Sequence, residues 1–502
     1  MFYEYLKQND LEDLLCKLDY DPPSFSNENK VFMYLYDIVK NKRRVLIEGD
    51  YDVDGLMCVL IMKEMFDILQ VNTYDVFKYR LKTHSIDKYA MFQCIPGHYV
   101  YFIVTDTGSS ELDIVQQICA TGTRVIILDH HNTKLDYSDF PSNCAIVNTI
   151  LENRILLYDK FALSAGALCF CVADKFCRTY FDFSLLSQSA YALTSLYADC
   201  MDMSNRLNRT IYWLATGLKL NAVPSYIRHF MNDYVVFGRR YIEYWYAPRI
   251  NSLFRSDNTE LINTYFFDTD KSVVKSKCIE TINKLYESER ELVYKISDIV
   301  TVQELNNFVQ ADLESVDDFI PVKENHLYNY TGLIANKLAD RYGKTAIVYC
   351  STSEFYKGSV RDKYNRNYLS TFQQFCYAGG HNSAFGFRVN LFDLDKFLKV
   401  TQRIDLYYAD KTSLNLPIIE QYDLAEPDTQ LINDMAQFND FSCSKVPSAY
   451  LRKQLVGVDK KFTSYGYKYL WGDFIIQSQN PLEYGSIILL KPTKKRTITL
   501  VT

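Results

Sequence analysis

Three short apolar runs in the first half of the chain each lead into a loop that is rich in carboxylate or imidazole side chains. The runs cover residues 44–47, 100–104 and 124–128. A helical pattern follows the first loop at residues 56–69, so strands alternate with helices. Such alternation predicts a doubly wound parallel sheet in which the loops after the strands meet at one edge. We therefore expect an α/β protein whose functional side chains lie at that edge.

The first of these loops carries four carboxylates within seven positions, at Glu48, Asp50, Asp52 and Asp54. Like charges at this density repel one another unless cations offset them. A solvated acidic turn or a helix N-cap would explain one such aspartate but explains four poorly. The loop therefore indicates a binding site for cations.

The other two loops add the carboxylate of Asp106 and the run Asp129, His130 and His131. Adjacent histidines directly after an apolar strand are seldom core residues. His130 is the better candidate for a metal ligand, Asp129 is placed to orient an imidazole, and His131 is left to contact a substrate. Oxygen-rich ligation with one imidazole suits Mn²⁺ or Mg²⁺ better than tetrahedral zinc.

The loops resemble motifs of a known family. The sequences Asp-Tyr-Asp-Val-Asp-Gly at 50–55, Asp-Thr-Gly at 106–108 and Asp-His-His at 129–131 are similar to the first three motifs of the DHH phosphoesterase superfamily. The segment Leu-Thr-Ser-Leu-Tyr-Ala-Asp at 193–199 resembles the fourth motif, a helix that ends in an aspartate. The resemblance implies a parallel-sheet DHH domain that holds two divalent metal ions.

Further segments narrow the resemblance to the RecJ-type single-strand exonucleases. Pro-Arg-Ile-Asn at 248–251 is similar to a stretch of these enzymes. Lys-Gly-Ser-Val-Arg at 357–361 and Ala-Gly-Gly-His at 378–381 are similar to the smaller α/β DHH-associated domain. In the family, the Gly-Gly-His loop of that domain faces the metal centre across a cleft.

The resemblance assigns roles around two divalent ions that assist phosphodiester hydrolysis, with Mn²⁺ favoured and Mg²⁺ as the alternative. One ion would bind Asp52. The other would bind Asp54, His130 and Asp199. Asp106 would bridge the two ions and count among the catalytic groups.

Three more residues border this implied centre. Asp50 is implied as a further ligand or as a carboxylate that supports one. His131 would bind the scissile phosphate and offset its developing charge. The sequence departs from the family at Glu48, four positions before Asp52, where many relatives have a histidine ligand. A carboxylate can bind Mn²⁺ or Mg²⁺, but its extra negative charge would weaken or alter the first metal site.

Substrate contacts are implied in the second domain. Gly379 and Gly380 would let the backbone approach a phosphate, and His381 would donate to its oxygen as a catalytic group. Ser359 and Arg361 resemble a pocket that grips a 5′ phosphate, because an arginine can bind two phosphate oxygens at once. Three further arginines are implied to contact the substrate, the last two of which could instead hold the linking helix: Arg80, Arg249 and Arg255.

The order of segments predicts four parts. A DHH domain spans 1–260, a linking helix 261–300 and the DHH-associated domain 301–405, and a small β-rich module follows at 411–502. Basic and aromatic side chains are concentrated in this module, which suits single-stranded nucleic acid, and the alternative is a solvated β surface. RecJ-type enzymes carry an oligonucleotide-binding (OB) barrel at this place, and the short strands fit an OB-like module.

Composition bounds the remaining choices. Lys and Arg number 55 against 61 Asp and Glu, a net charge of −6, so a nucleic-acid site must be a local patch. The 13 cysteines lack a C-x-x-C pair and suit reduced thiols. We expect no signal peptide, no membrane span and no membrane partner, hence a cytoplasmic protein of a bacterium or an infected host cell. The usage of Tyr, Asn and Lys and the divergent motifs suit a viral genome, such as that of a phage, or an AT-rich one.

The motifs predict a hydrolase, namely a metal-dependent 5′→3′ single-stranded DNA exonuclease of the RecJ type that acts in replication, recombination or repair. RNA stays open as a substrate, and single-strand-binding or replication proteins are the expected partners. One alternative is a phosphodiesterase for oligonucleotides or cyclic dinucleotides, against which the length and the segment 248–251 argue. Another is an inactive RecJ-like scaffold, which only Glu48 favours.

Overall fold

The computed structural model of the 502-residue chain divides into two compact units. The first unit comprises residues 1–250, 263–269 and 416–502, and the second comprises residues 251–262 and 270–415. The structure describes residues 2–9, 11–80, 84–94, 98–156, 160–231, 236–268, 271–319, 327–362, 366, 368–381, 383–408, 419–422, 428–441, 450–454, 459–463, 466–471, 474–478, 482, 487–493 and 497–501. Within these ranges, no helix combines the length and the apolar character that crossing a bilayer requires.

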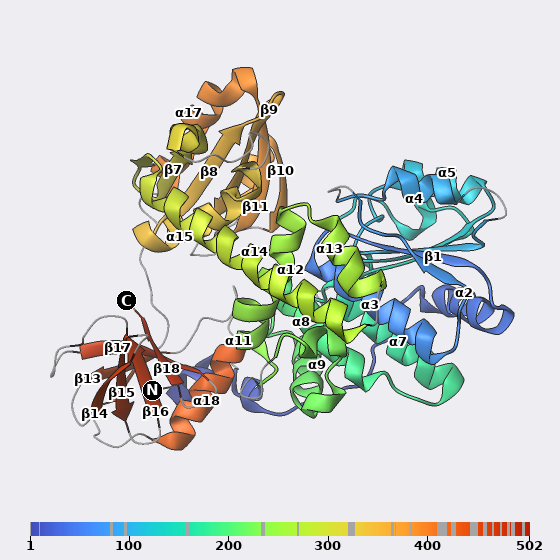
Figure 1. Ribbon diagram of the computed structural model, residues 1–502, viewed down its shortest axis with the longest axis horizontal. Helices are drawn as coiled ribbons and strands as arrows, with labels where there is room; N and C mark the ends of the chain where they lie inside the picture. The colour runs from blue at the N-terminus through green and yellow to red at the C-terminus, as the bar shows by residue number, and fades with distance from the viewer. Residues whose placement is uncertain are drawn as a thin grey trace. The chain divides into compact units, whose positions relative to one another are not determined.

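The first unit is built on a parallel sheet with the strand order β2-β1-β3-β4-β5 (Figure 1). Its register places Gly49 beside Thr105 and Thr105 beside Leu128, so β1, β3 and β4 end at the same level. The strands are β1 (Val45–Gly49), β2 (Tyr74–Val76), β3 (Tyr101–Thr105), β4 (Arg124–Asp129) and β5 (Cys144–Asn148). Runs of buried Val, Ile and Leu are typical of a parallel sheet that is covered on both faces.

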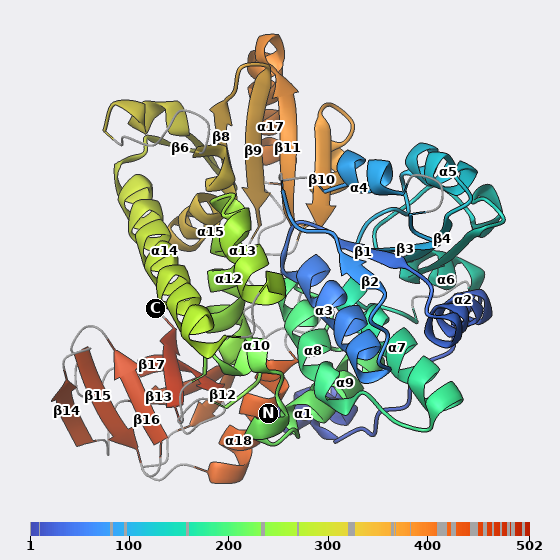
Figure 2. The same cartoon turned by 45° about the vertical axis from the view of Figure 1, so that its right-hand side comes forward.

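Helices cover both faces of this sheet, with α4 and α5 on one side and α3 and α7 on the other (Figure 2). Phe102, Val104 and Ile127 pack on the first side against Val115 and Ile118 of α5. The helices of the first unit are α1 (Phe2–Gln8), α2 (Glu28–Asn41), α3 (Val53–Ile68), α4 (Lys88–Gln93), α5 (Leu112–Ala120), α6 (Thr149–Leu156), α7 (Ala165–Phe181), α8 (Ser189–Ala198), α9 (Arg206–Thr216), α10 (Ser225–Arg228) and α11 (Arg239–Tyr241). The predicted α/β class with a doubly wound parallel sheet is confirmed.

The second unit contains a mixed sheet in the order β10-β11-β9-β8-β7-β6, in which β7 and β8 are parallel. On one face of the sheet, Ile296 of α14 and Ile334 of α15 share a core with Val348 of β8. The core on the other face includes Phe372 and Phe387. The strands are β6 (Val302–Glu304), β7 (Phe308–Asp312), β8 (Thr345–Ser351), β9 (Phe355–Arg361), β10 (Tyr377–His381) and β11 (Ala384–Asn390). The helices from residue 247 to residue 408 are α12 (Ala247–Arg255), α13 (Thr259–Asn263), α14 (Ser272–Ile299), α15 (Thr331–Tyr342), α16 (Leu369–Phe372) and α17 (Leu394–Tyr408).

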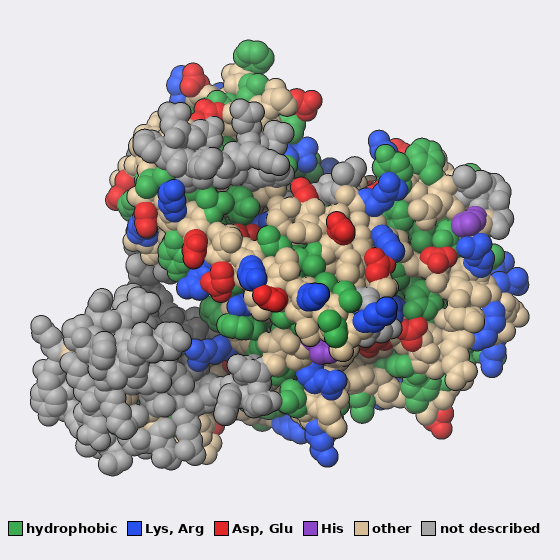
Figure 3. Space-filling view, viewed as in Figure 1, with side chains coloured by type: hydrophobic (Ala, Val, Ile, Leu, Met, Phe, Trp, Pro, Cys, Tyr) green, Lys and Arg blue, Asp and Glu red, His purple; other side chains and the backbone are tan. Residues whose placement is uncertain are grey.

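The long helix α14 lies within residues 261–300, which the sequence predicts as a linking helix, and it belongs to the second unit. Acidic and basic side chains lie side by side over its exposed face, as Figure 3 shows, and one such pair joins Lys284 to Glu280 at 2.7 Å. Exposed pairs of this kind add little stability. The guanidinium of Arg255 instead grips the buried Glu289 of α14 with two contacts, at 3.0 and 2.6 Å. This bidentate ion pair attaches α12 to α14.

Residues 416–502 belong to the first unit and contain a sheet in the order β12-β13-β17-β18-β16-β15-β14. α18 (Thr429–Asp440) lies against β17, and its last residue is bound by Tyr197 and Tyr212, whose hydroxyls donate to the carbonyl and the carboxylate of Asp440 at 3.1 and 2.5 Å. Tyr469 is buried. For the basic residues predicted to bind nucleic acid, the structure describes at most the backbone and not the side chains. The strands are β12 (Ile419–Tyr422), β13 (Tyr450–Gln454), β14 (Asp459–Thr463), β15 (Gly466–Trp471), β16 (Phe474–Ser478), β17 (Ile487–Thr493) and β18 (Thr497–Val501).

Candidate metal centre

The loop between β1 and α3 is shaped by a helix cap and a glycine. Asp52 caps α3, because its Oδ1 accepts a hydrogen bond from Gly55 N at 3.0 Å. A Cβ at Gly55 would lie 2.4 Å from the backbone N and O of Asp50, so the loop can fold back this closely only over a glycine. The fold of the loop brings Asp50 and Asp52 together and places Asp54 in the first turn of α3.

Asp54 is buried and is held by the beginning of α7. Its Oδ2 accepts a hydrogen bond from Ala165 N at 3.0 Å, and its Oδ1 accepts from Gly166 N at 2.8 Å. The Oγ of Ser195 donates to the same Oδ1 at 2.5 Å. Free amides at a helix N-terminus favour a negative charge, so α7 holds this carboxylate in place.

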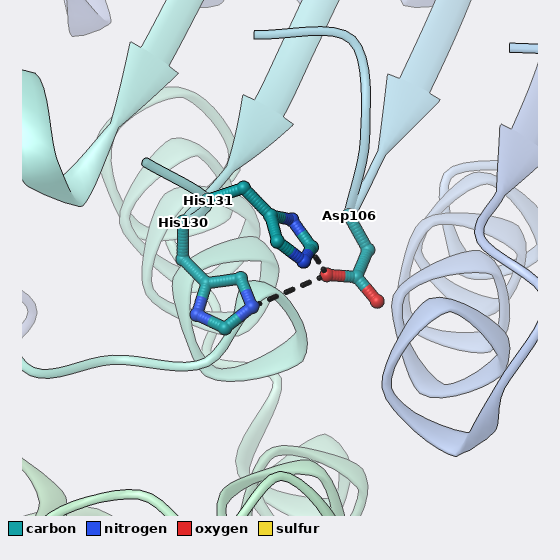
Figure 4. Close-up of side chains that lie close together, drawn as sticks. All are labelled: Asp106, His130 and His131. Carbon is teal, nitrogen blue, oxygen red and sulfur yellow. Dashed lines mark ion pairs between the residues drawn. The ribbon is translucent and has the colours of Figure 1, made fainter. Parts of the chain in front are cut away.

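Asp106 follows β3 with an uncommon left-handed backbone, at a φ of 61°, and its N–H donates to Leu128 O at 2.9 Å. Its side chain is 1% exposed, and neither carboxylate oxygen has a hydrogen-bond partner among the residues that the structure describes. Oδ1 lies 3.4 Å from His130 Nε2 and 3.8 Å from His131 Nδ1 (Figure 4). A buried carboxylate that is aimed at two imidazoles and lacks a hydrogen-bond partner indicates a ligand-binding role.

His130 lies among carboxylates that come from three other loops or helices. Its Nε2 is 3.4 Å from Asp106 Oδ1, 3.5 Å from Asp199 Oδ2 and 3.8 Å from Asp54 Oδ2. Asp199 directly follows the last residue of α8, as the fourth motif predicts. The structure therefore brings together side chains from all four sequence motifs.

The donor atoms form neighbouring sets, in each of which all atoms lie within 4.8 Å of one another: Asp54 with His130 and Asp199, Asp50 with Asp52 and Asp106, and Asp106 with His130 and His131. The donors are carboxylate oxygens and imidazole nitrogens, which suit Mn²⁺ and Mg²⁺. Asp50 Oδ1, like the oxygens of Asp106, is buried without a hydrogen-bond partner in the described part of the chain. The residues present therefore fit divalent cations.

Burial and mutual repulsion raise the pKa values of these carboxyls in the absence of a cation. Burial, followed by the charge of Asp50, raises the pKa of Asp52 to about 6. Burial raises the pKa of Asp54 to about 6 despite the nearby His130. Burial and then Asp54 raise the pKa of Asp106 well above its usual range. Binding of a divalent cation would favour the ionised forms of all three carboxyls.

Asp129 orients His131. Its Oδ1 accepts hydrogen bonds from His131 Nδ1 at 2.8 Å and from the backbone amides of His130 and His131 at 2.7 and 3.1 Å. Burial alone would raise the pKa of Asp129, but the hydrogen bond and charge of His131 hold it below its usual range. For His131 burial has the opposite effect and lowers the pKa, but the hydrogen bond and charge of Asp129 outweigh it and raise the pKa to about 10. Asp129 therefore fixes one ring nitrogen of His131 and favours the cationic form of the ring in the metal-free chain.

Glu48 lies outside these donor sets. Its Oε1 accepts a hydrogen bond from Asp87 N at 2.7 Å, and burial raises the pKa of Glu48 well above its usual value. A residue to which we assigned no role, His84, lies beside the centre, with its Nδ1 3.0 Å from Asp50 Oδ2. His84 is separated from Asp50 by 34 positions, so no local sequence pattern could have revealed the contact.

In the second unit, Ser359 and Arg361 lie beside the beginning of α15. Ser359 Oγ is 2.9 Å from Thr331 Oγ1. A Cβ at Gly332 would lie 2.7 Å from Arg361 Nη2 and 3.5 Å from Ser359 Oγ, so this glycine leaves room for both polar groups. The first turn of α15 thus borders two of the residues predicted to grip a 5′ phosphate, and Thr331 is a neighbour that we did not predict.

The predicted Gly-Gly-His segment lies in β10 and pairs with β11. Gly380 has a φ of 130°, which a glycine adopts readily. Gly379 has open space where a Cβ would stand. The side chain of His381 lies outside the described residues, so its predicted role stays a prediction.

The arginines predicted to contact substrate differ in their surroundings. Arg80 lies over the ring of Tyr89 at 4.6 Å. Arg249 is buried, lies 3.5 Å from the centre of the Trp245 ring and donates to the carbonyl of the same residue at 2.8 Å. Arg255 binds Glu289 of α14. This contact agrees with the second of the two roles predicted for Arg255, that of holding the linking helix. Contacts of these side chains with a substrate stay predictions.

Comparisons with known proteins agree with the motifs. Residues 44–201 match the DHH family, N-terminal domain. YorK of Bacillus subtilis strain 168, whose name describes a prophage-derived single-strand DNA-specific exonuclease, is 25% identical over 447 residues, which cover 78% of this chain and 73% of YorK. The single-stranded-DNA-specific exonuclease RecJ of the same organism is 22% identical over 385 residues, which cover 75% of this chain and 47% of RecJ.

A solved structure supports the fold. RecJ from Thermus thermophilus, crystallised in complex with Mn²⁺, matches with a TM-score of 0.72 at 14% identity and covers 99% of this chain and 74% of that one. The predicted resemblance to the DHH superfamily and its RecJ-type members is confirmed, and so is the prediction of a hydrolase of the nuclease or phosphodiesterase class.

Proposed function

We propose that this chain, which carries a DHH-family N-terminal domain, is a metal-dependent 5′→3′ single-stranded DNA exonuclease of the RecJ type. The observation that carries the proposal is the buried carboxylate of Asp106, which stands between two sets of donor atoms and has no hydrogen-bond partner among the described residues. The names of two relatives, both single-strand DNA-specific exonucleases, support the same activity.

Two divalent ions would be held by the donor sets, with Mn²⁺ favoured and Mg²⁺ as the alternative. The proposed ligands of one ion are Asp50, Asp52 and Asp106, and those of the other are Asp54, Asp106, His130 and Asp199. When bound, the ions would stabilise the attacking and leaving oxygens of an in-line displacement at phosphorus. Crystal structures of RecJ from Thermus thermophilus hold Mn²⁺ in one case and Mg²⁺ in another, which supports a divalent ion of either kind.

His131 would bind the scissile phosphate. Asp129 fixes its Nδ1 and favours the cationic form of the ring, because its hydrogen bond and charge raise the pKa of His131. A fixed cation beside a phosphate stabilises the negative charge that develops as the bond breaks, without any reorganisation at that moment. Asp129 therefore acts on the reaction through His131.

The second unit would hold the 5′ end of the strand. Arg361, Ser359 and the first turn of α15 offer a guanidinium, a hydroxyl and backbone amides, all of which bind phosphate oxygens. Gly379, Gly380 and His381 would approach a neighbouring phosphate. We also propose the division into a DHH domain at 1–260, a linking helix at 261–300, a DHH-associated domain at 301–405 and a nucleic-acid-binding module at 411–502.

The proposed setting is the cytoplasm of a bacterium, in DNA replication, recombination or repair. Single-stranded DNA is the proposed substrate, and single-strand-binding or replication proteins are the proposed partners. The name of YorK, which describes a prophage-derived protein, supports a phage origin for this chain as well.

The test uses one long single strand labelled at its 5′ end in one sample and at its 3′ end in another, with Mn²⁺ present. We expect labelled mononucleotide from the 5′-labelled strand at the earliest times, whereas the 3′-labelled strand should shorten stepwise. An RNA strand of the same sequence and a set of di- and trinucleotides complete the substrates.

Each alternative has its own outcome. Cleavage confined to the di- and trinucleotides would favour an oligonucleotide phosphodiesterase. Strand binding without cleavage would favour an inactive scaffold. Mononucleotides released first from the 3′ end would contradict the proposed polarity.

A further inference from the structure

The segment between β2 and α4 approaches the metal centre through His84. Its Nδ1 lies 3.0 Å from Oδ2 of Asp50, whose side chain is 5% exposed, while the imidazole itself is 59% exposed. The segment makes a second contact with the same aspartate, because the hydroxyl of Tyr79 donates to the carbonyl of Asp50 at 3.1 Å. Asp50 is therefore held at both its backbone and its carboxylate.

Two carboxyl groups, that of the buried Glu48 and that of the half-buried Glu111, hold the main chain of this segment just after His84. Glu48 Oε1 accepts a hydrogen bond from Asp87 N at 2.7 Å. Glu111 Oε2 accepts one from Ile86 N at 2.8 Å. Because Glu48 stands at the end of β1 and Glu111 directly precedes α5, the segment is anchored to two separate elements of the rigid sheet domain.

The contact leaves the two oxygens of Asp50 in different states. Oδ2 faces His84, whereas Oδ1 is buried without a hydrogen-bond partner among the described residues. The carboxylate of Asp50 also belongs to a donor set with Asp52 and Asp106. A carboxylate whose one oxygen is held by an imidazole N–H can present the other oxygen to a cation in a fixed direction. Without the imidazole, Asp50 would be free to turn away from the like charges of Asp52 and Asp106.

We propose that His84 is a positioning residue for the first metal site: it holds Oδ2 of Asp50 so that Oδ1 stays available to a cation bound together with Asp52 and Asp106, and Glu48 anchors the segment that carries His84. The inference rests on the proposed function, since it concerns the metal centre of that function. It also gives Glu48 a role, because this buried carboxyl holds the main chain of the segment that carries His84. The donor sets place neither Glu48 nor His84 among the ligands themselves.

The experiment titrates the full chain with Mn²⁺ and follows free Mn²⁺ by electron paramagnetic resonance. Four proteins are compared: the parent, His84→Ala, His84→Asn and His98→Ala. His98 is an exposed histidine that contacts Arg44 and lies outside the donor sets, so it controls for loss of an imidazole. An asparagine amide can donate to Asp50 from nearly the position of Nδ1, so His84→Asn tests the hydrogen bond itself.

We expect the parent and His98→Ala to bind two Mn²⁺ ions per chain with the same affinities. In His84→Ala, one of the two sites should weaken by about 10- to 100-fold, as is usual when a group that orients a ligand is lost. His84→Asn should recover most of this affinity. The nuclease activity of His84→Ala should return at high Mn²⁺ with an unchanged KM for DNA, which a general loss of structure would not produce.

The failures of the two proposals are distinguishable. If the parent binds two Mn²⁺ ions and His84→Ala binds them equally tightly, the inference about His84 is overturned and the proposed function stands. Equal weakening of both sites, or no recovery in His84→Asn, would also overturn it. A parent that binds no Mn²⁺ would overturn the inference together with the proposed function.

Discussion

At the scale of residues, the centre stores electrostatic repulsion that a cation would relieve. Asp54 and Asp106 are buried and Asp52 is half-buried, and loss of contact with water is the largest cause of their raised pKa values. Ionised carboxylates in such surroundings destabilise the fold, so the unliganded protein gains stability by taking up protons. The three carboxylates therefore destabilise the unliganded fold, and a cation-binding role explains why they lie together.

This repulsion predicts the pH dependence of the metal-free protein. Asp54 has a pKa of about 6 in the folded chain and about 3.9 in an unfolded chain, so the folded state binds more protons between these values. Its contribution to stability is therefore present at low pH and lost as the pH rises through about 6. With a chelator present, Asp54→Asn should melt at a higher temperature than the parent at pH 8 and show a smaller difference between the two at pH 5. Equal melting temperatures at pH 8 would contradict the assigned repulsion.

The residue scale also shows what sequence reasoning could reach. The candidate ligands could be proposed from the sequence because most of them follow an apolar strand or end a helix, and their residue types suit one chemistry. The contact of His84 with Asp50 and the amides of Ala165 and Gly166 on Asp54 were not, because they join segments that are far apart in the chain. Such contacts depend on how the elements pack, which no local pattern records.

At the scale of elements, the loop between β1 and α3 depends on one glycine. A Cβ at Gly55 would lie 2.4 Å from backbone atoms of Asp50, which cannot move aside as a side chain can. We expect Gly55→Ala to lower the free energy of unfolding by about 1–3 kcal/mol, as overpacking does, and to weaken Mn²⁺ binding by displacing Asp50. Thermal or denaturant unfolding and a Mn²⁺ titration measure the two effects.

The matched control for this variant is Gly386→Ala in β11. A Cβ there meets only a carbonyl oxygen at 3.7 Å, so ordinary contact is kept and both measurements should stay near the parent values. If Gly55→Ala behaved like Gly386→Ala, the close approach of the loop would not control the site.

The first turn of α15 makes a second prediction at this scale. A Cβ at Gly332 would lie 2.7 Å from Arg361 Nη2, so Gly332→Ala should displace the guanidinium from the proposed 5′-phosphate pocket. A charged hydrogen bond contributes about 1.5–3 kcal/mol, so kcat/KM for 5′-phosphorylated over 5′-hydroxyl strands should fall by about 10- to 100-fold. Arg341→Ala, near the end of the same helix, should keep the parent ratio. A ratio that is unchanged in Gly332→Ala would remove Arg361 from the pocket.

Among the elements, the strongly periodic ones were predictable and the glycine-rich or short ones were not. The apolar runs that became β1, β3 and β4 agree with the prediction closely. By contrast, β10 contains Gly379 and Gly380, which weaken a strand on their own, and it forms through pairing with β11. β5 is a short buried strand at residues 144–148 that local periodicity alone does not distinguish from other short apolar runs.

At the scale of the whole molecule, the net charge of −6 does not describe the charge at any one place. Several of the negative charges lie in the metal centre, where bound cations would offset them. The residues at 416–502 share a unit with the sheet of the metal centre, and α18 is attached there by Tyr197 and Tyr212. The net charge alone would argue against a nucleic-acid partner. The placement of the charges shows that several carboxylates lie at the candidate metal centre, where they would bind cations.

The measurement that tests the central claim most directly is the rate of mononucleotide release from the 5′ end of a long single strand, in the parent, in Asp106→Ala and in Asp113→Ala. Asp113 is an exposed aspartate on α5 and controls for loss of a carboxylate. The account predicts that a chelator abolishes release by the parent, that added Mn²⁺ restores it, and that Asp113→Ala behaves like the parent. Asp106→Ala should be slower by more than about 100-fold at any Mn²⁺ concentration, since metal ions supply several kcal/mol of transition-state stabilisation. An Asp106→Ala protein that digests the strand as fast as the parent would contradict the account.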